Sequence, residues 1–462
     1  MAPAVLALVL GLWGVRRGGS IWRDEVVSYD MARRPLPDLW AALGHADAVH
    51  GLYYLLLHGL FRIAGDTDPL LVLRLPSVLA IAVAAGTLAL LGSRLAGPRA
   101  GLLAGLVFAV LPPVQRYAQE GRSYALVCAL VIWATYLLVR AADRRGPWLP
   151  YGMVMLTACL LHEFAVLVLP AHLLAVLHRT ALRAALAVCV GLAPLAVLSS
   201  RQSEQVAWIG GLGVGALAGF AGVGAVGVAC AILLGSRPVT RLAVPLTILP
   251  ALVLILLTPL KPLYVDRYVL YGHAGTALLL GAALDDLPRR AGRVRTVALL
   301  AAGAALLSLL PVALHLRTPQ SRTDDATAVA GAIGAMDADG VLYLPSRRRV
   351  WSLTALSGLV DVALARTPTA SATLYGTEAA PSVIRARMLA TARIVVVEDP
   401  PDQPRDRSPQ EVVKRRVLER CFVRDSVRRL QGAQISRYVR RCAPYAPPAR
   451  TRPPAGARSP RP

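Results

Sequence analysis

Long apolar runs, separated by short polar loops, make up the first two thirds of the sequence. The runs are continuous, without the alternation of a half-buried strand or the one-sided stripe of a surface helix, and this pattern is typical of helices that cross a membrane. Eleven such helices are predicted, at residues 2–15, 72–91, 101–111, 124–139, 151–161, 164–177, 184–198, 212–234, 242–257, 269–284 and 297–314. Several are shorter than the roughly 20 residues of a straight span, so we expect their ends to extend into the loops.

The pattern changes after residue 314, where the apolar runs end. Strand-like runs occupy residues 340–345 (GVLYLP) and 392–399 (ARIVVVED), and residues 408–421 have the composition of a helix. These elements predict a small α/β domain outside the membrane. The expected organisation is a transmembrane domain at 1–315 with a first outer loop at 16–71, the α/β domain at 323–442, and a disordered Pro- and Arg-rich tail at 443–462.

The first outer loop contains one more apolar stretch, GLYYLLLHGLFRIAG at residues 51–65. Its length and its polar flanks are those of a helix that lies in the membrane interface, not of one that crosses. We therefore expect this loop to follow the surface of the lipid bilayer.

The composition agrees with a membrane protein and adds a strong positive charge. Of the 462 residues 55% are hydrophobic, the formal net charge is +23, and Lys261 and Lys414 are the only lysines. Much of the arginine lies in short loops, which membrane topology explains more simply than a nucleic-acid partner. No nucleic acid is therefore expected among the partners.

The same arginines predict how the chain is oriented in the cell membrane. Alternate loops are basic, and the positive-inside rule then places these loops and the N-terminus in the cytoplasm and the C-terminal domain outside it. The inner-loop arginines are Arg94, Arg99, Arg140, Arg144, Arg145, Arg179, Arg183, Arg237, Arg241, Arg289, Arg290, Arg293 and Arg295. The first outer loop is also rich in arginine, so either the first helix is oriented otherwise or the loop needs positive charge for chemistry.

Polar segments gather on the predicted outer side. They are WRDE at 22–25, QRYAQEGRSYAL at 115–126, His162 with Glu163, SRQSEQVAW at 199–208, and PLYVDRYVL at 262–270. Ionisable residues are costly near a bilayer, so their convergence on one face indicates a binding or catalytic site there.

The order of these motifs resembles a known family. WRDE after the first helix, HGLYYLLLHGLFRIAG at 50–65, RLPSVLA from Arg74, QEGRSYAL and DRYVL look like the membrane glycosyltransferases of the C-type (GT-C) fold. The similarity is greatest to the protein O-mannosyltransferase and aminoarabinose-transferase superfamily (family 39), and within it to actinobacterial mannosyltransferases; it runs from about residue 21 to about residue 314. Many members read His-Pro-Pro-Leu where this chain has His50-Gly51-Leu52, so substrate details tied to that turn are not carried over.

The resemblance implies a polytopic enzyme that transfers a glycosyl group, here a mannosyl group, from a polyprenyl-phosphate donor to the hydroxyl of an extracytoplasmic glycan or protein. In such enzymes the first-loop Asp of the Asp-Glu pair is the proposed base, which here is Asp24, followed by Glu25 as a second catalytic candidate. A carboxylate at hydrogen-bond distance accepts the proton of the attacking hydroxyl as an oxocarbenium-like transition state forms, and a single displacement inverts the anomeric centre.

The departing polyprenyl phosphate calls for fixed cations, and guanidinium groups match the geometry of phosphate. Arg122 and Arg267 are the first candidates for this role, followed by Arg116. Candidates for substrate binding in the same outer segments are His50, Glu120, Tyr124, His162, Glu163, Asp266 and Tyr268.

Simpler interpretations of these residues stay open. Glu120 and Arg122 also suit an ion pair at an interface, and His162 with Glu163 suits a polar helix cap as well as a metal ligand or an acceptor contact. The cysteines of the apolar runs have no ligand-like spacing, so neither a metal site nor a cofactor is predicted, although a need for a divalent metal is left open. Cys421 and Cys442 are the only cysteines of the second domain and are candidates for a disulfide in an oxidising exterior.

Two other functions compete with an enzyme. A transporter or flippase of lipid-linked sugars would have ionisable residues in the middle of the membrane and inverted repeats, and neither is visible in the sequence. A non-catalytic protein whose second domain binds cell-envelope polymer is the remaining alternative.

Overall fold

The computed structural model describes the whole chain except residues 145–146, 204–210, 288–291, 353–358, 402 and 443–462. It divides into two compact units, of which the first comprises Met1–Ala328 with Pro368–Leu374 and the second Val329–Thr367 with Tyr375–Pro462. The predicted disordered tail at 443–462 lies outside the described residues. Each unit is considered by itself.

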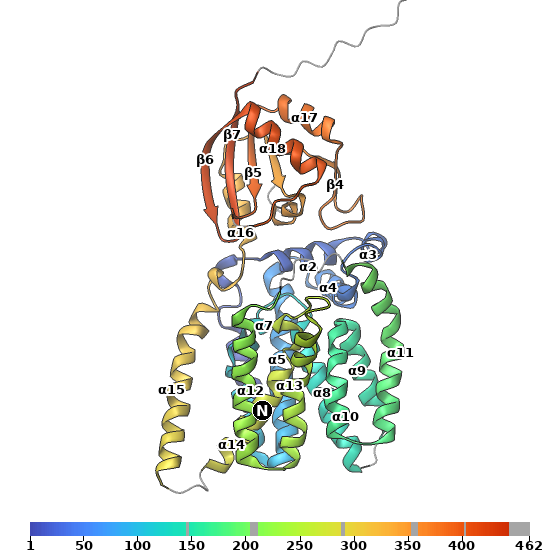
Figure 1. Cartoon of the computed structure of the whole chain (residues 1–462), viewed down its shortest axis with the longest axis vertical. Coiled ribbons are helices and arrows are strands. Elements are labelled where there is room, and N and C mark those ends of the chain that lie inside the picture. The colour runs from blue at the N-terminus through green and yellow to red at the C-terminus, as the bar shows by residue number, and fades with distance from the viewer. Residues whose placement is uncertain (145–146, 204–210, 288–291, 353–358, 402, 443–462) are drawn as a thin grey trace, which may run out of the picture. The chain divides into compact units, whose positions relative to one another are not determined.

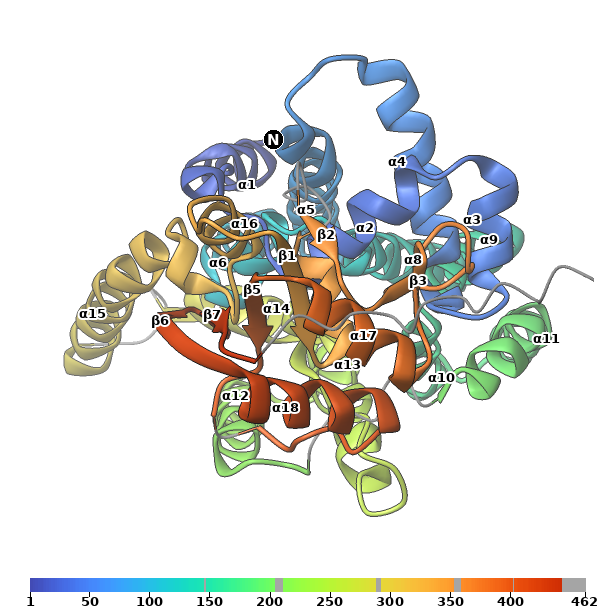
Figure 2. The same cartoon turned by 90° about the horizontal axis from the view of Figure 1, so that it is seen from above.

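The first unit is built from helices, as the apolar runs predict (Figure 1). Three shorter helices, α2, α3 and α4, lie together at one end of the bundle (Figures 1 and 2). The helices are α1 (Ala2–Leu12), α2 (Arg23–Arg33), α3 (Leu36–Leu43), α4 (Gly51–Ala64), α5 (Pro69–Ala96), α6 (Pro98–Val110), α7 (Pro112–Ala118), α8 (Tyr124–Arg144), α9 (Leu149–Leu161), α10 (Leu169–Ala175), α11 (Arg179–Arg201), α12 (Val214–Leu234), α13 (Pro238–Leu257), α14 (Gly272–Asp286) and α15 (Arg293–His315).

Several of the apolar helices are short or bent. In the described part of the chain, α5, α8, α11, α12 and α13 are long and apolar enough to cross a membrane, and the total reaches seven if each of two bent helix pairs is one span. The pairs are α1 with α2, bent by 91°, and α6 with α7, bent by 64°. Pro112 and Pro113 follow directly after α6, and proline breaks a helix because it lacks an amide donor and clashes with the preceding turn. The multi-pass helical architecture is confirmed, whereas the number of eleven spans stays a prediction.

Glycines bring three of these helices into close contact. A Cβ atom added at Gly281 of α14 would lie 2.4 Å from the backbone nitrogen of Ala104 in α6, and one at Gly92 of α5 would lie 2.8 Å from the Cα atom of Gly101, also in α6. Small residues let membrane helices approach in this way. The position of α5 is thereby fixed, and α5 carries Arg74.

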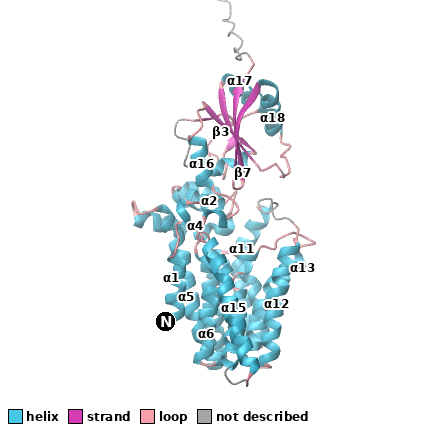
Figure 3. Ribbon diagram, turned by 90° about the vertical axis from the view of Figure 1, so that its left-hand side faces the viewer, coloured by secondary structure: helices cyan, strands magenta, loops and turns pink. Residues whose placement is uncertain are grey.

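The second unit contains a five-stranded sheet in the order β2-β1-β5-β7-β6 (Figure 3). Strands β1, β2 and β5 are parallel, whereas β7 is antiparallel to both of its neighbours. The strands are β1 (Gly340–Leu344), β2 (Val360–Asp361), β5 (Arg393–Glu398), β6 (Phe422–Leu430) and β7 (Ala433–Arg440), with a separate pair formed by β3 (Leu364–Arg366) and β4 (Thr377–Glu378). The predicted small C-terminal α/β architecture is confirmed.

Two helices, α17 (Pro381–Ala390) and α18 (Pro409–Cys421), close the core of the second unit; α16 (Ala326–Gly334) precedes the sheet. Leu342 and Ile394 of the sheet share one buried apolar cluster with Ile384 of α17 and Val417 of α18. Strands β1 and β5 are buried along nearly their whole length, and this explains their continuous apolar sequences.

Cys421 and Cys442 lie next to each other in the second unit as free thiols. The amide of Cys442 lies 3.4 Å from the carbonyl oxygen of Cys421. A hydrogen bond between the two side chains raises the pKa of the Cys421 thiol. The predicted disulfide is therefore not formed in this structure, and pairing in an oxidising compartment stays a prediction.

Candidate active site

The first turn of α2 carries the two neighbouring carboxylates, Asp24 and Glu25. Negative side chains are favourable there because the N-terminus of a helix is electropositive. The amide of Arg23 donates to the Asp324 Oδ1 atom at 2.7 Å, so the segment after α15 satisfies one of the free N–H groups at this helix start. The helix therefore begins at a defined residue, at the end of the bundle.

Glu25 is fully buried and its carboxylate is saturated with fixed donors. Its Oε2 atom accepts from Arg17 and from Arg74, each at 2.7 Å, and its Oε1 atom accepts from Arg74 at 2.8 Å and from the amide of Gly121 at 3.0 Å. Burial raises the pKa of Glu25, but Arg17 and Arg74 outweigh this effect and lower it to about 2. The interpretation of Glu25 as a second catalytic residue is therefore corrected: no oxygen of its carboxylate is left for a substrate, and it anchors α2.

Asp24 has a different environment. It is 8% exposed, and its nearest charged partners are Arg23 at 3.4 Å and Arg267 at 3.5 Å, both longer than a good charge-assisted hydrogen bond. Burial raises the pKa of Asp24, but Arg122 and Arg267 outweigh it and lower the pKa below its ordinary value. The carboxylate is thus ionised, with acceptor capacity that the protein does not fill.

Two arginines from distant segments flank Asp24. Arg122, just before α8, donates to the hydroxyl oxygen of Tyr54 at 2.9 Å and to that of Ser28 at 3.3 Å, and lies 3.7 Å from Asp47. Arg267 lies on the short helix Asp266–Val269. Its guanidinium is 5.4 Å from the ring centre of Tyr124 and 5.7 Å from that of Tyr268. The site formed by Asp24, Arg122 and Arg267 is called the Asp24 site below.

Aromatic rings surround this site. The rings of His162 and Tyr268 are 4.7 Å apart, and His50 lies 5.4 Å from His162 and 5.9 Å from Tyr124, as measured between ring centres. Burial lowers the pKa of His50 well below its ordinary value, and its Nδ1 atom lies 3.2 Å from the Ser123 hydroxyl. His50 is therefore a neutral imidazole, and four of the seven substrate-binding candidates share one cluster.

Glu120 and Arg116 have partners of their own. The Glu120 Oε1 atom is 3.4 Å from the Nε atom of Arg322, and burial raises the pKa of Glu120. The guanidinium of Arg116 lies 5.8 Å from the ring centre of Tyr117, and its positive charge partly opposes the rise in the pKa of Glu120. Glu120 therefore pairs with an arginine that the sequence interpretation did not consider, and not with Arg122.

Asp266 and Glu163 also have structural partners. The hydroxyl of Tyr117 donates to the Asp266 Oδ1 atom at 2.9 Å, and the hydroxyl of Ser199 donates to the Glu163 Oε2 atom at 2.5 Å. Among the described residues, no group of three or more His, Cys, Asp or Glu side chains could hold a metal ion.

Sequence reasoning missed the buried partners of this region. Arg17 and Arg322 are 1% and 3% exposed and interact with Glu25 and Glu120, respectively. A signal existed for both, since each lies in a polar segment directly beside an apolar run on the predicted outer side. Their partners lie far away in the sequence, so the spacing could not identify the pairs.

Comparisons with known proteins bear on the fold of the chain. Residues 52–203 match the family model described as dolichyl-phosphate-mannose-protein mannosyltransferase. The structure is similar to that of ArnT from Cupriavidus metallidurans in the apo state, with a TM-score of 0.55, 14% identity, and coverage of 94% of this chain and 97% of that chain. It is also similar to ArnT from the same organism bound to undecaprenyl phosphate, with a TM-score of 0.54, 13% identity, and the same coverage. No curated protein matches the sequence.

Replacing Arg74 by Met should destabilise the first unit strongly. The substitution leaves the buried Glu25 carboxylate without its bidentate partner, and removing one member of a buried pair costs about 3–5 kcal/mol. The free energy of unfolding in mixed detergent micelles measures the effect. Arg94→Met is the matched control on the same helix, because Arg94 forms an exposed pair with Asp143, and such pairs contribute about 0–1 kcal/mol. Equal effects of the two substitutions would contradict the anchoring role of Glu25.

Proposed function

We propose that this chain, a membrane glycosyltransferase of the GT-C type, transfers a sugar from a polyprenyl-phosphate donor to an acceptor hydroxyl, with Asp24 as the general base. The observation that carries the proposal is the state of Asp24, a buried and ionised carboxylate between two arginines that leave its oxygens incompletely bonded. ArnT, which has the same fold, was crystallised with undecaprenyl phosphate, and this supports a polyprenyl phosphate as the carrier.

In the proposed reaction the acceptor oxygen attacks the anomeric carbon of the sugar while its proton passes to the Asp24 carboxylate. The bond from the anomeric carbon to the phosphate oxygen breaks, and its electron pair leaves with the polyprenyl phosphate. A single displacement inverts the anomeric centre. Arg267 and Arg122 stabilise the charge that develops on the phosphate, because fixed guanidinium groups in a buried site need no reorganisation during the reaction.

Mannose is the sugar that we propose, with a glycan or a protein as the acceptor. The matching family model describes a mannosyltransferase that uses dolichyl phosphate mannose. The aromatic rings of Tyr124, Tyr268 and His162 beside Arg267 offer apolar faces on which a sugar ring can pack. Purified protein incubated with a panel of radiolabelled polyprenyl-phosphate sugars tests both the reaction and the sugar, through turnover of the carrier.

Asp24→Asn should lower turnover by about 10²-fold or more, because the amide keeps the size of the side chain but cannot accept the proton. Binding of the donor should be retained, since the arginines that contact the phosphate are unchanged. The measurement is transfer from radiolabelled polyprenyl-phosphate mannose, together with donor binding. Asp66→Asn, at an exposed position of the same outer loop, is the charge-matched control. Near-normal transfer by Asp24→Asn would exclude Asp24 as the base.

Arg267→Ala should move the acid limb of the pH–rate profile to higher pH. A base works only when ionised, so activity falls as the pH drops through the pKa of Asp24. In the native protein this pKa is depressed, and the limb lies below the ordinary aspartate value of about 3.9. Without Arg267 one lowering charge is lost while burial, which raises the pKa, remains. The pH dependence of kcat/KM measures the shift, and Arg62→Ala, an exposed arginine of α4, should leave the limb in place.

The Asp24 site should face the outside of the cell, with the N-terminus in the cytoplasm, because the arginine-rich loops between alternate spans belong on the inner side. In a variant without the six native cysteines, a single cysteine at Asp66 should react with an impermeant thiol reagent in intact cells. A single cysteine at Ser236, in the exposed loop between α12 and α13, should react only after permeabilisation. The reverse pattern would overturn the orientation.

A further inference from the structure

The sheet of the second unit contains a topological switch point. Strand β1 has parallel neighbours on both sides, β2 on one and β5 on the other. From the carboxyl end of β1 the chain goes on to β2, on one side of β1. From the carboxyl end of β5 it goes on to β6 and β7, on the other side. The two connections therefore diverge at the carboxyl ends of β1 and β5. In open α/β sheets, ligands bind in the crevice outside this point.

A pocket lies at this crevice. Leu344 and Glu398 are the last residues of β1 and β5 and are register partners, and both line a cavity of about 390 Å³. This cavity shares Pro404, Arg405 and Arg415 with a second one of about 680 Å³. The two cavities therefore adjoin each other, and the smaller one is also lined by the carboxylates of Glu398, Asp399 and Glu419.

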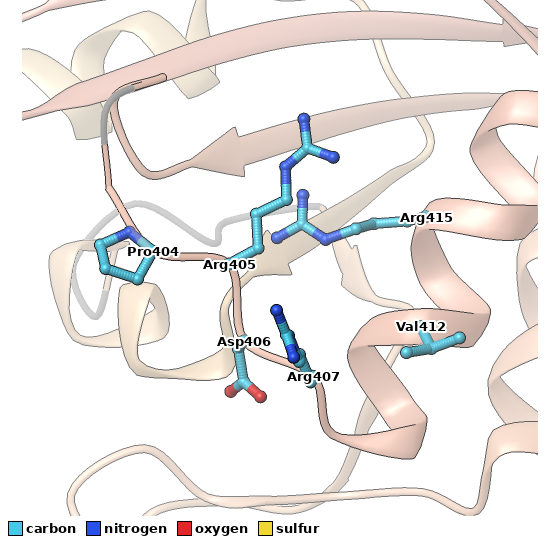
Figure 4. A pocket seen from close by; sticks show the side chains of 6 residues that line it. All are labelled: Pro404, Arg405, Asp406, Arg407, Val412 and Arg415. Carbon is cyan, nitrogen blue, oxygen red and sulfur yellow. The ribbon is translucent and has the colours of Figure 1, made fainter.

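The larger cavity, here called the arginine pocket, has an unusual charge. Its lining comprises Pro404, Arg405, Asp406, Arg407, Val412 and Arg415 (Figure 4). Figure 4 shows the carboxylate of Asp406 pointing away from the guanidinium groups of Arg405 and Arg415. The Asp406 Oδ1 atom instead accepts from the amide of Ser408 at 2.8 Å, just before α18. Three guanidinium groups thus line one hollow together with a single carboxylate, Asp406, which points away from two of them.

The three arginines of the pocket lack charged partners where the structure describes the chain; Arg405 and Arg407 are exposed, and Arg415 is partly buried. Within the described part of the chain, the side chains of Arg405, Arg407 and Arg415 form no hydrogen bond or ion pair, and the Nε atom of Arg415 is shielded from water without a partner. Five other arginines of the unit pair with carboxylates: Arg347 and Arg348 with Asp399, Arg349 with Asp361 and Glu378, Arg393 with Asp337 and Asp339, and Arg437 with Asp425. Further arginines without such a partner among the described residues, such as Arg416 and Arg428, do not line the pocket.

An anion would relieve this arrangement. Like charges that lie close together repel each other, and a buried donor without a partner, such as the Nε atom of Arg415, is destabilising. A guanidinium group can donate two parallel hydrogen bonds to the oxygens of a phosphate. The first turn of α18 contributes Val412 to the lining, and the electropositive start of this helix adds to the attraction for an anion. We propose that the arginine pocket is a second anion site of this protein, separate from the Asp24 site, that binds the phosphate group of a phosphorylated sugar or an isoprenoid lipid.

Titration of the full-length protein in detergent micelles with inorganic pyrophosphate, followed by calorimetry at low ionic strength, tests the site. The double variant Arg405→Ala/Arg415→Ala should bind at least about tenfold more weakly, because two of the three charged donors are lost. Arg405→Lys/Arg415→Lys keeps the charge without the fork of donors and should show an intermediate loss. Arg416→Ala is the matched control, since Arg416 is the next residue of α18, is exposed, and does not line the pocket.

A further variant distinguishes binding of pyrophosphate at the arginine pocket from binding at the Asp24 site. Arg122→Ala/Arg267→Ala should retain the heat of binding that Arg405→Ala/Arg415→Ala removes. Unchanged binding in Arg405→Ala/Arg415→Ala, or an equal loss in Arg416→Ala, would overturn the proposal. Competition then identifies the source of the phosphate: displacement of pyrophosphate by a short isoprenyl phosphate assigns a lipid, and displacement by mannose 1-phosphate assigns a sugar. Displacement by neither would refute a phosphate ester as the ligand.

Discussion

The buried ion pairs of Glu25 hold the end of the helical bundle together. A carboxylate removed from water is strongly destabilising unless charged donors surround it, and here Arg17, Arg74 and the amide of Gly121 fill all its acceptor positions. Arg74 also donates to the carbonyl oxygens of Val15 and Ser20, at 2.7 and 2.6 Å. One guanidinium group therefore joins the sharp bend between α1 and α2 to α5, and the position of every residue on the first turn of α2 depends on it.

Two adjacent carboxylates thereby acquire different chemistry. Successive residues of a helix point in directions about 100° apart, so Glu25 faces the arginines of the bundle while Asp24 faces Arg122 and Arg267. Both pKa values are lowered by arginine against the effect of burial. The difference lies in acceptor capacity, since the oxygens of Glu25 are saturated at about 2.7–3.0 Å and the contacts of Asp24 are looser. The anchored Glu25 thereby fixes the position of Asp24, the proposed base, and leaves the lone pairs of the Asp24 carboxylate free to accept a proton.

The arginine excess that gives the chain its net charge serves several purposes. In exposed loops it forms ordinary surface pairs, as Arg94 does with Asp143. In the first outer loop Arg17 compensates a buried carboxylate and Arg34 is also buried, so part of the positive charge that contradicted the simple topology rule is internal. In the second unit some arginines, such as Arg348 and Arg349, bind carboxylates, whereas those of the arginine pocket have no such partner among the described residues. Net charge alone does not distinguish these uses.

The sequence by itself determined the class of the protein. An uninterrupted apolar run satisfies its backbone hydrogen bonds when it forms a helix in lipid, so such runs predict membrane helices. Short apolar strands that alternate with helices indicate a small α/β domain. Both units can therefore be predicted from the local sequence pattern. The motif order also singled out Asp24, Arg122 and Arg267, which the tertiary structure places together. Only the tertiary structure decided that Glu25 is an anchor, that Glu120 pairs with Arg322, and that several runs are bent or too short to span. The reason is physical: hydropathy is a property of neighbouring residues, whereas the partner of a charge is set by packing between segments that lie 49, 96 or more residues apart.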